Sequence, residues 1–483
     1  MYGLAPERPP PAPAMPNALL PVSFRRALSR AVPAAGALAA VVALGAPAAR
    51  PAAAQRSAAP STPAAPTIGL VRDARLAALL DDVRPARLRA DDSTLVAFGT
   101  RHTMSDTLSA TRGIGAARRW LYGQLRDVSR GCGGCLRVEY DAAPLVVARH
   151  PQRPTVNVVN VLAWLPGRDT SRVVVLGGHY DSCVCSVNPM DSTSDAPGAD
   201  DDGSGTAAVL ELARAFAARY PRGLEATVVF ALFAAEEQGL LGSTHLAARL
   251  RREGYRVDGA ITNDIVGNVE AEDGRRDATT VRVFAPDPEN GPAREFARMA
   301  WAVGALYQPA FRVLPVWRLD RIGRGGDHAP FARQGDPAIR FTERLENYKR
   351  QHLPTDDLAH VDFDYVARVA RLNGALVGAL ASAPAAPSGA AAARDRESGG
   401  QRWRMTWQPV AGAASYEVLV RATSAPTWER VIPVGAGTSY LLEDQLDDVW
   451  AGVRAVGANG HRSLASVVPG PPRAAPPAEP APR

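Results

Sequence analysis

Apolar, β-branched runs alternate with stretches of helical periodicity between about residue 67 and residue 382. This alternation is typical of an α/β domain, in which helices cover a sheet of buried strands. The runs at 171–177 and 226–233 are long enough for buried strands, and residues 206–220 between them have the spacing of an amphipathic helix. These three segments predict a βαβ unit with parallel strands.

The same pattern extends through the rest of this region. Further strands are expected at 157–165, 260–265 and 280–284, and further helices at 293–303 and 366–380. Residues 96–382 are therefore predicted to form a three-layer α/β/α domain, with a mixed, mostly parallel sheet covered by helices on both faces. For the preceding residues 55–95 two interpretations stay open, a propeptide-like extension and a part of the fold.

The pattern changes after residue 382. Residues 383–400 are rich in Pro, Ala, Gly and Ser and are expected to be a linker. Residues 401–470 indicate a small all-β sandwich, with short strands expected at 402–410, 414–422, 439–442 and 449–456. The segments WQP (407–409), YEV (416–418) and WAGVRA (450–455) resemble those of a fibronectin type III domain. A Pro/Ala-rich tail follows at 471–483.

Most of the net charge lies near the N-terminus. The 483 residues carry a formal net charge of +6, with a pI of about 9.3. Residues 1–54 contain five arginines and one acidic residue, so the rest of the chain is close to neutral. Because the sequence has no basic run with interleaved aromatic residues, a nucleic-acid partner is not expected.

The arginine-rich N-terminus fits an export signal. Two arginines at 25–26 precede an apolar stretch at 32–49, and the alanines at 52–54 supply the small residues of a cleavage site. Residues 1–54 are therefore predicted to be a signal peptide, and the mature protein is expected to be periplasmic or secreted, without a membrane span. A membrane anchor is the alternative, but prolines bracket an apolar stretch that is short for a bilayer.

The cysteines fall into two close pairs, Cys132 with Cys135 and Cys183 with Cys185. An oxidising compartment favours disulfides over free thiolates, so disulfides are predicted, with all three connectivities open. A zinc site made of all four cysteines is the alternative.

Polar residues stand where the predicted strands end, which is where α/β folds build their sites. The set comprises His179, Asp181, Asp201, Glu236, Glu237, Asp264 and His352. Each of these residues alone has a structural explanation, such as helix capping or a hydrogen bond within a turn. Together they form a set of carboxylates and imidazoles suited to two zinc ions.

Five segments in this region carry a resemblance to a known family. They are HYDS (179–182), PGADDDGSG (197–205), AAEEQGLLGS (234–243), TNDIVGN (262–268) and QHLPTDD (351–357). In this order and at these intervals they resemble the M28 family of two-zinc aminopeptidases, over roughly residues 95–380.

The resemblance implies a ligand set for two zinc ions. His179 and Asp264 would bind one ion, and Glu237 and His352 would bind the other. Asp201 would bridge both ions, because the family places its bridging aspartate in an Asp-x-x-Ser-Gly segment, and the peptide bond after it would be cis. Two cations held this way can share a water, lower its pKa and polarise the scissile carbonyl.

The two adjacent glutamates are expected to have different roles. Neighbouring side chains at a strand end point to different sides, so one can bind metal while the other accepts a proton from the attacking water. The resemblance assigns Glu236 as the general base and Glu237 as the ligand. Asp181, two residues after His179, is expected to accept the free ring N–H of that histidine.

A further segment, GGDHAPF at 325–331, is similar to the family's Ser-Asp-His-x-x-Phe segment. Asp327 and His328 are therefore candidates for substrate contact, with loop stabilisation as the alternative. Many relatives have a tyrosine where this chain has Gln351, which leaves the oxyanion donor open. Tyr348 is the candidate to replace it.

These observations predict an exported metallo-aminopeptidase with peptide substrates and two zinc ions. The sequence has no His-Glu-x-x-His and no Gly-x-Ser-x-Gly, which disfavours one-zinc endopeptidases of that type and serine hydrolases. A carboxypeptidase or amidase with the same metals, a single-zinc glutaminyl cyclase and a non-catalytic scaffold are the alternatives. For the C-terminal module two roles stay open, binding of a polymer or cell surface and packing on the catalytic domain.

Overall fold

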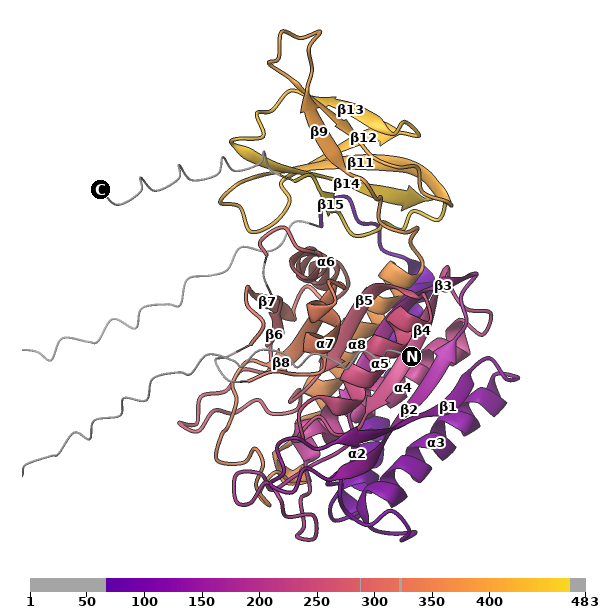
Figure 1. The fold of residues 1–483 in the computed structure, drawn as a ribbon, viewed down its shortest axis with the longest axis vertical. Helices are drawn as coiled ribbons and strands as arrows, with labels where there is room; N and C mark the ends of the chain where they lie inside the picture. Colours follow the sequence, from indigo (N-terminus) through magenta and orange to yellow (C-terminus); the bar gives the residue numbers. More distant parts are fainter. Residues whose placement is uncertain (1–66, 287, 321–323, 470–483) are drawn as a thin grey trace, which may run out of the picture. The chain divides into compact units, whose positions relative to one another are not determined.

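The larger part of the chain is built on one mixed β-sheet. The computed structural model describes residues 67–469 except 287 and 321–323, and within them this sheet has the strand order β1-β2-β4-β3-β5-β8-β6-β7 (Figure 1). Its strands are β1 (Arg137–Val146), β2 (Thr155–Leu165), β3 (Asp169–His179), β4 (Ala226–Phe233), β5 (Arg256–Asn263), β6 (Thr280–Phe284), β7 (Arg312–Val316) and β8 (Ala338–Glu343). The pairs β3/β4, β3/β5, β5/β8 and β6/β7 are parallel, which confirms the mixed, mostly parallel sheet.

Three predicted segments lie partly or wholly outside the described residues. They are the signal peptide at 1–54, the first part of the extension at 55–66 and the tail at 471–483.

The predicted βαβ unit lies in the middle of the sheet. β3 and β4 are neighbours in parallel register, from Val173 opposite Thr227 to His179 opposite Phe233, and α4 (Gly205–Arg219) connects them. Both strands are buried on both faces over their apolar runs, as expected for the interior of a sheet covered twice.

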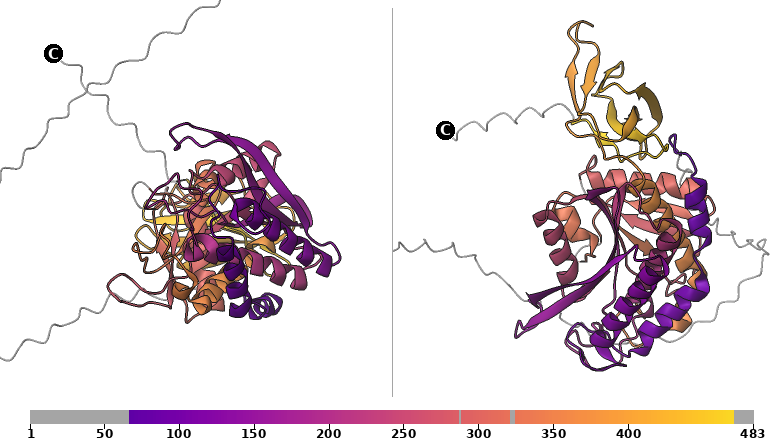
Figure 2. Two further views of the ribbon diagram at one scale, coloured as in Figure 1. Left: turned by 90° about the horizontal axis from the view of Figure 1, so that it is seen from below. Right: turned by 90° about the vertical axis from the view of Figure 1, so that its right-hand side faces the viewer.

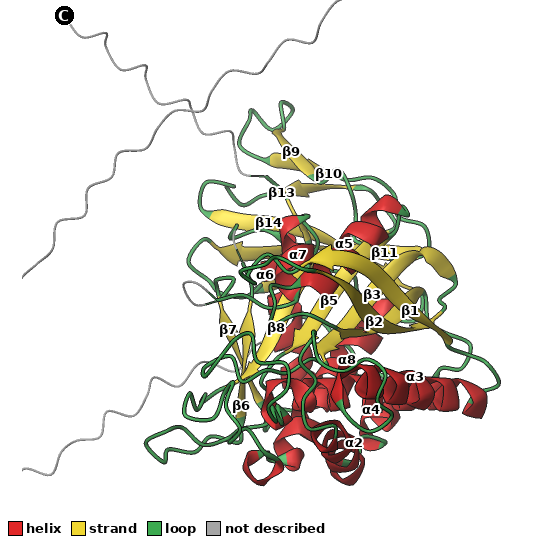
Figure 3. Cartoon of the chain, turned by 60° about the horizontal axis from the view of Figure 1, so that its bottom comes forward, coloured by secondary structure: helices red, strands yellow, loops and turns green. Residues whose placement is uncertain are grey.

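Helices cover both faces of the sheet (Figure 2). Val173 and Val175 of β3 pack in one core with α5 (Leu241–Arg252) and α7 (His328–Arg333). The intervening Val174 and Leu176 point into the other core, whose helices are α1 (Ala74–Asp81), α2 (Pro85–Ala97), α3 (Gly113–Gly131), α4, α6 (Pro292–Tyr307) and α8 (Phe363–Ala381). Figure 3 shows α2, α3 and α4 gathered on that side of the strands. Successive side chains of β3 thus pack alternately into the two cores, one on each face of the sheet, which confirms the three layers.

The described part of the N-terminal extension belongs to this fold. Leu76 and Leu79 of α1 and Leu88 and Leu95 of α2 are fully buried in the larger core. Removing these leucines would open the helical layer beneath the sheet, so α1 and α2 pack as part of its core.

β5 ends at a different residue from the one predicted, and β1 was not predicted. β5 ends at Asn263 rather than 265, because the chain turns at Asp264 and Ile265 has a positive φ of 61°. β1 pairs antiparallel with β2 at the edge of the sheet and is largely exposed, so it lacks the apolar run by which the interior strands were predicted.

The C-terminal region forms two antiparallel sheets, as predicted for a small all-β module. One has the order β13-β10-β9 and the other β12-β11-β14-β15. The strands are β9 (Ala391–Arg394), β10 (Trp403–Thr406), β11 (Ala413–Ala422), β12 (Arg430–Gly435), β13 (Ser439–Leu442), β14 (Val449–Gly457) and β15 (Ser466–Val467). Their shared core includes Trp403, Trp407, Tyr416 and Val453.

The predicted linker at 383–400 was wrong in one respect. Residues 391–394 form β9, which pairs with β10 in register from Ala391 opposite Thr406 to Arg394 opposite Trp403. This strand has the sequence AAAR, and its small, mostly exposed side chains give no apolar alternation to detect. Backbone pairing alone defines it.

The C-terminal module contacts α6 through a group of charged and aromatic side chains. Trp428 Nε1 donates to Glu295 Oε2 at 2.8 Å, and Arg298 Nη1 donates to Glu295 Oε1 at 2.6 Å. Arg421 Nη2 donates to Glu289 Oε1 at 3.0 Å, and Arg298 also forms an ion pair with Glu289. We call these five residues the domain-contact cluster. In it each glutamate pairs with at least one arginine, and Arg294 also forms an ion pair with Glu289.

Both close cysteine pairs form disulfides, Cys132–Cys135 and Cys183–Cys185, so the four-cysteine zinc site was wrong. Within residues 67–469, apart from the undescribed positions, no helix is long and apolar enough to span a membrane.

Candidate metal centre

A cavity of about 550 Å³ opens at the carboxyl ends of β3, β4 and β5. Four acidic side chains and one imidazole line it, namely Asp201, Glu236, Glu237, Asp264 and His352. These residues are far apart in the sequence, and the parallel strands bring them to the same edge of the sheet, as predicted.

The candidate ligands form two groups that share one residue. His179, Asp201 and Asp264 offer ligand atoms that all lie within 4.8 Å of one another, and so do Asp201, Glu237 and His352. Asp201 Oδ1 lies 3.2 Å from His179 Nε2, whereas Asp201 Oδ2 lies 3.0 Å from His352 Nε2. One carboxylate oxygen therefore faces each group, which is the geometry of a bridging ligand. We call these five residues the metal centre.

The polar turn η1 (Ala199–Ser204) presents Asp201 alone of its three aspartates to the cavity. Asp200 Oδ1 accepts the Gly267 N–H at 2.7 Å, and Asp202 Oδ2 accepts the His179 N–H at 3.0 Å. Both of these carboxylates are thus used to hold the surrounding backbone. The Asp201–Asp202 peptide bond is cis, as the family resemblance implies.

Asp356 fixes the backbone of this turn from the opposite side. Its two carboxylate oxygens accept the N–H groups of Asp200 and Asp201 at 2.9 and 3.0 Å. This aspartate stands in the QHLPTDD segment, but its role was not predicted, because a hydrogen bond to a backbone 155 residues away leaves no spacing signal. It ties the loop that carries His352 to the turn that carries Asp201.

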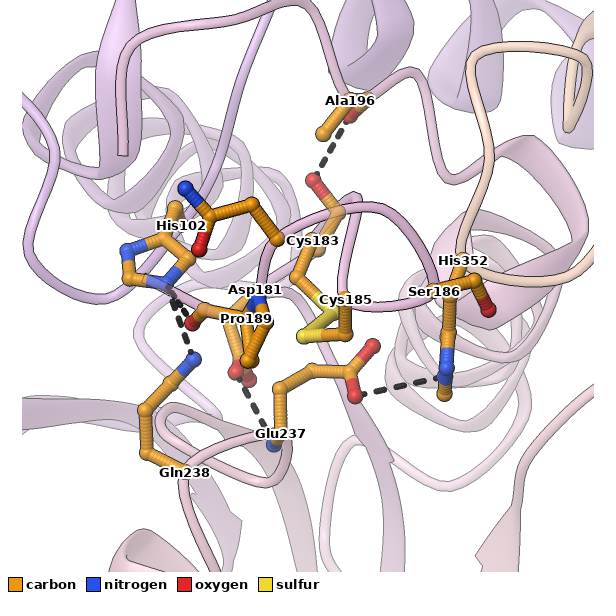
Figure 4. Close-up of a disulfide and its surroundings, with 12 residues drawn as sticks. His102, Asp181, Cys183, Cys185, Ser186, Pro189, Ala196, Glu237, Gln238 and His352 are labelled. Atoms are coloured by element: carbon orange, nitrogen blue, oxygen red, sulfur yellow. Dashed lines mark hydrogen bonds and ion pairs between the residues drawn. A yellow bond between two sulfur atoms is a disulfide. The ribbon is translucent and has the colours of Figure 1, made fainter. Parts of the chain in front are cut away.

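Asp181 does not act through its carboxylate in the way the sequence predicted. The closest approach of that carboxylate to His179 Nδ1 is 3.7 Å, beyond hydrogen-bond distance, and it is the Asp181 backbone carbonyl that lies 3.1 Å from this nitrogen. The carboxylate instead accepts the N–H groups of Glu236 and Glu237 at 3.2 and 3.3 Å (Figure 4). Asp181 therefore orients His179 with its backbone and the glutamate pair with its side chain.

The Cys183–Cys185 disulfide lies beside the metal centre. Figure 4 shows it next to Glu237, whose carboxylate points to His352 with an Oε2 to Nε2 distance of 3.3 Å. The next residue, Ser186, donates its N–H to the His352 carbonyl at 3.3 Å. The disulfide thus braces the segment that holds the His352 loop.

Several backbone turns at the centre adopt the left-handed region. Ala235, next to Glu236, has φ 59°, Ile265, next to Asp264, has φ 61°, and His352 itself has φ 57°. Non-glycine residues are rarely found there, and they concentrate at sites where the surrounding structure must fix a side chain. The chain bends sharply at each of these points, which turns the candidate ligand toward the cavity.

The electrostatics of the centre favour a bound cation. Burial raises the pKa of Glu237 to about 7, and the Glu237 carboxylate in turn raises the pKa of His352 to about 10. Burial alone would lower the pKa of His179, but Asp201 and the neighbouring carboxylates raise it well above its ordinary value. A field that holds protons on imidazoles this strongly also attracts metal ions.

The residues present fit zinc. His179 Nε2 and Glu237 Oε1 are buried and have no hydrogen-bond partner, although buried polar atoms normally have one. Two imidazoles and three carboxylates are the nitrogen and oxygen ligands that zinc uses in catalytic sites. A metal ion bound at each of the two ligand groups would supply the missing partner of His179 Nε2 and of Glu237 Oε1.

Glu236 and Asp264 complete the cavity wall. Burial raises the pKa of Glu236 well above its ordinary value, and the charges of Asp264 and Glu237 add to the rise. Asp264 Oδ1 lies 3.0 Å from Nη2 of Arg340, which is 1% exposed and also pairs with Asp320. Arg340 therefore holds Asp264 from below, a role for which its strand position in β8 gave no sequence signal.

The supporting residues of the GGDHAPF segment do not line the cavity, whereas Tyr348 does. Asp327 is buried, burial raises its pKa to about 7, and its charge adds to the rise in the pKa of Glu236. His328 Nε2 lies 3.0 Å from the Leu319 carbonyl, and burial lowers the His328 pKa to about 4. Loop stabilisation is therefore the better interpretation of His328.

Arg149, Ser186 and Arg324 line the cavity and were not predicted. They lie in loops whose approach to the site depends on the tertiary fold, with no motif around them. Arg149 stands between β1 and β2, and Arg324 stands between β7 and α7.

Comparison with known proteins agrees with the family resemblance. The model of peptidase family M28 matches residues 160–377. A protein named "Probable zinc metalloprotease" from Pyricularia oryzae is 41% identical over 431 residues, which cover 82% of this chain and 84% of that protein. One of the same name from Pyrenophora tritici-repentis is 39% identical over 428 residues, covering 81% of this chain and 86% of that protein.

A solved structure shows the same fold. The LapA aminopeptidase of Legionella pneumophila is similar to this chain with a TM-score of 0.51 and 20% identity, over 65% of this chain and 76% of that one. At this identity the likeness concerns the arrangement of helices and strands rather than the reaction.

Proposed function

Because the chain belongs to peptidase family M28 and is a zinc-dependent peptidase, we propose that it is an exported aminopeptidase with two zinc ions. It would remove N-terminal residues from peptides. The fold it shares with a structure described as an aminopeptidase supports this assignment, although the fold by itself does not set specificity.

The observation that carries the proposal is the position of Asp201 between two groups of ligands. Each group holds Asp201 together with one histidine and one further carboxylate. Zinc ions bound there supply Lewis-acid chemistry, which activates a water and polarises the scissile carbonyl. A single-zinc glutaminyl cyclase is disfavoured because the second group is complete, and a scaffold protein is disfavoured because Glu236 is retained beside both groups.

Glu236 is the residue that would move the proton. It lines the cavity, and burial raises its pKa well above its ordinary value, the direction expected of a carboxylate that serves as a general base. It would accept a proton from the attacking water and pass it to the leaving amine. Asp181 keeps it in place by accepting its backbone N–H.

Export is part of the proposal. It is supported by the signal-like N-terminal sequence and by two disulfides, which persist in oxidising compartments. We also propose that the C-terminal module is a fibronectin type III-like accessory domain. Its domain-contact cluster supports packing on the catalytic domain over binding of a polymer or cell surface.

The test combines metal analysis with hydrolysis of aminoacyl anilides and their N-acetylated forms. The wild-type protein should contain two zinc ions and release amine from the free substrates only. Glu236→Gln should retain the metal but lose about 1000-fold in kcat, as expected for a general base. Wild-type rates in Glu236→Gln, or cleavage of the blocked anilides, would contradict the proposed mechanism or the proposed specificity respectively.

A further inference from the structure

We propose that Arg149 and Arg324 select peptides that carry a carboxylate next to the scissile bond. The carboxylate could belong to an N-terminal Asp or Glu side chain or to the C-terminus of a dipeptide, since both place the same group close to the metal centre. This inference rests on the proposed function and names its substrate class.

Arg324 supplies a positive charge that is only partly balanced. Its Nη1 donates to Glu346 Oε2 at 2.8 Å, but Arg282 forms an ion pair with the same carboxylate. One carboxylate thus serves two guanidinium groups. The Arg324 side chain is 25% exposed and lines the cavity, so its remaining N–H groups can reach a ligand there.

Arg324 lines the same cavity as both halves of the centre. Asp264, of the first ligand group, and His352, of the second, line that cavity with it. A carboxylate bound to Arg324 would therefore lie close to the reacting atoms rather than at a remote surface.

Arg149 approaches from another wall of the cavity. Its Nη1 lies 3.4 Å from the Glu237 carbonyl oxygen, and no carboxylate forms an ion pair with it among the described residues. The turn after Glu237 passes beside this arginine, because a Cβ at Gly239 would lie at ordinary contact distance, 3.4 Å, from Arg149 Nε.

The charge balance of the cavity favours an anion once the metal is bound. The carboxylates of its described lining are those of Asp201, Glu236, Glu237 and Asp264, and two zinc ions would neutralise them. Each carboxylate has a role in metal binding or proton transfer, so none is left to pair with a basic substrate side chain. Among the described residues, Leu240 is the single large aliphatic one of the lining, which gives an extended apolar side chain little to pack on there. Arginine in such a place recognises carboxylates through paired N–H donors.

The experiment uses two pairs of peptides that differ only in the carboxylate. Glu-Ala-amide against Gln-Ala-amide tests a side-chain carboxylate, and Ala-Ala against Ala-Ala-amide tests the C-terminal one. The zinc-loaded wild-type protein should prefer the acid in at least one pair by about 10- to 100-fold in kcat/KM, with most of the difference in KM, as expected for a charge-assisted hydrogen bond. The pair that shows the preference identifies the source of the carboxylate.

Variants assign the preference to residues. Arg324→Gln and Arg149→Gln should each reduce the preferred ratio, and Arg324→Lys should restore part of it because it keeps the charge without the paired donors. Arg430→Gln, in the C-terminal module, is the matched control and should leave the ratio unchanged. Isothermal titration of the same peptides into Glu236→Gln gives the preference as a ratio of dissociation constants, independent of turnover.

The outcomes separate this inference from the proposed function. Hydrolysis of all four peptides at similar rates, or a preference that survives both glutamine substitutions, would overturn the carboxylate selectivity while leaving the aminopeptidase intact. If none of the peptides is hydrolysed, the proposed function fails. The ratio of dissociation constants of the paired peptides for Glu236→Gln then still tests the selectivity, and a ratio near one in both pairs overturns it.

Discussion

The metal centre and the domain-contact cluster both bring charged side chains together, but they balance their charges differently. In the domain-contact cluster each glutamate has an arginine partner, and Trp428 satisfies the remaining oxygen of Glu295. In the metal centre three carboxylates meet two imidazoles, and the buried atoms His179 Nε2 and Glu237 Oε1 have no hydrogen-bond partner. The domain-contact cluster also contains a buried atom without a hydrogen-bond partner, Arg421 Nε, but a guanidinium N–H cannot bind a cation. The unsatisfied imidazole nitrogen and carboxylate oxygen of the metal centre can bind one, and they converge on a cavity, which indicates a ligand site.

The largest expected effect is that of Asp201→Asn, because Asp201 is the one residue common to both ligand groups. An amide cannot offer two anionic oxygens, so zinc content should fall from two ions to one or fewer. The loss of charge stabilisation should lower kcat by at least about 1000-fold. Metal analysis and peptide hydrolysis measure the two effects, and Glu289→Gln in the domain-contact cluster is the control that keeps its zinc. A fully loaded, fully active Asp201→Asn would show that Asp201 is not the bridge.

Removal of zinc should destabilise the protein through the metal centre only. Each ion that binds the folded state stabilises it by about 4 kcal/mol when free zinc is 1000 times its Kd, and a chelator removes this contribution. Chemical unfolding with and without a chelator measures the difference. Arg421→Met, in the domain-contact cluster, should lower stability at both conditions but leave the difference between them unchanged. A smaller zinc contribution in that variant would mean that the two clusters are coupled.

Arg298→Met should be the most destabilising single change in the domain-contact cluster. Arg298 is 2% exposed and pairs with Glu295, which is equally buried, so its removal leaves a buried carboxylate without its main partner. Breaking a buried pair in this way costs about 3 kcal/mol in free energy of unfolding. Urea unfolding measures it, and Arg130→Met on the exposed end of α3 serves as the surface control with a change below about 0.5 kcal/mol. Equal effects at the two positions would remove the distinction between buried and surface pairs.

The sequence predicted only part of the sheet. β4 and β6 were placed at their observed bounds. Edge strands such as β1, β7 and β9 were missed because a partly exposed strand is defined by pairing with its neighbour rather than by buried side chains. β8 was missed although it is buried inside the sheet, because its sequence AIRFTE mixes apolar with charged residues and gives no apolar run.

The candidate site could be predicted where its residues sit in motifs at strand ends. The five residues of the metal centre come together in the fold, and Glu236 lies beside them. The residues that orient the site could not be predicted, because Asp356, Arg340 and Arg324 act across long sequence separations from positions without a pattern. The sequence correctly predicted that Asp181 contacts His179, but it assigned the contact to the carboxylate instead of the backbone carbonyl. A spacing of two residues does not distinguish these two acceptors.

The Cys183–Cys185 disulfide should affect one half of the metal centre more than the other. It lies beside Glu237 and precedes Ser186, which donates to the His352 carbonyl. Replacing both cysteines with serine should weaken zinc binding at the group containing Glu237 and His352 by about tenfold, the size expected when a neighbour that orients a ligand is lost. Competition with a zinc indicator resolves the two affinities. The matched control removes Cys132–Cys135 by the same substitutions and should change neither, and equal weakening of both ions in the first variant would contradict a local role.

Asp336 provides a smaller test, of an acid that lies outside both clusters. Burial raises the pKa of Asp336 to about 6, and no ligand group among the described residues includes it. Because the folded pKa lies above the unfolded value, the folded state holds the proton more tightly. The stabilisation that this proton gives the folded state is therefore complete below about pH 4 and is lost as the pH rises through 6.

Asp336→Asn should then raise the free energy of unfolding by about 1 kcal/mol at pH 7.5, after allowance for solvent screening, and change it little at pH 4. Urea unfolding of both proteins in chelator measures this, and zinc content should be unaffected. If Asp336→Asn stabilises the protein equally at both pH values, the effect comes from packing rather than from the charge. If the variant loses zinc, Asp336 affects the metal centre although it belongs to neither ligand group.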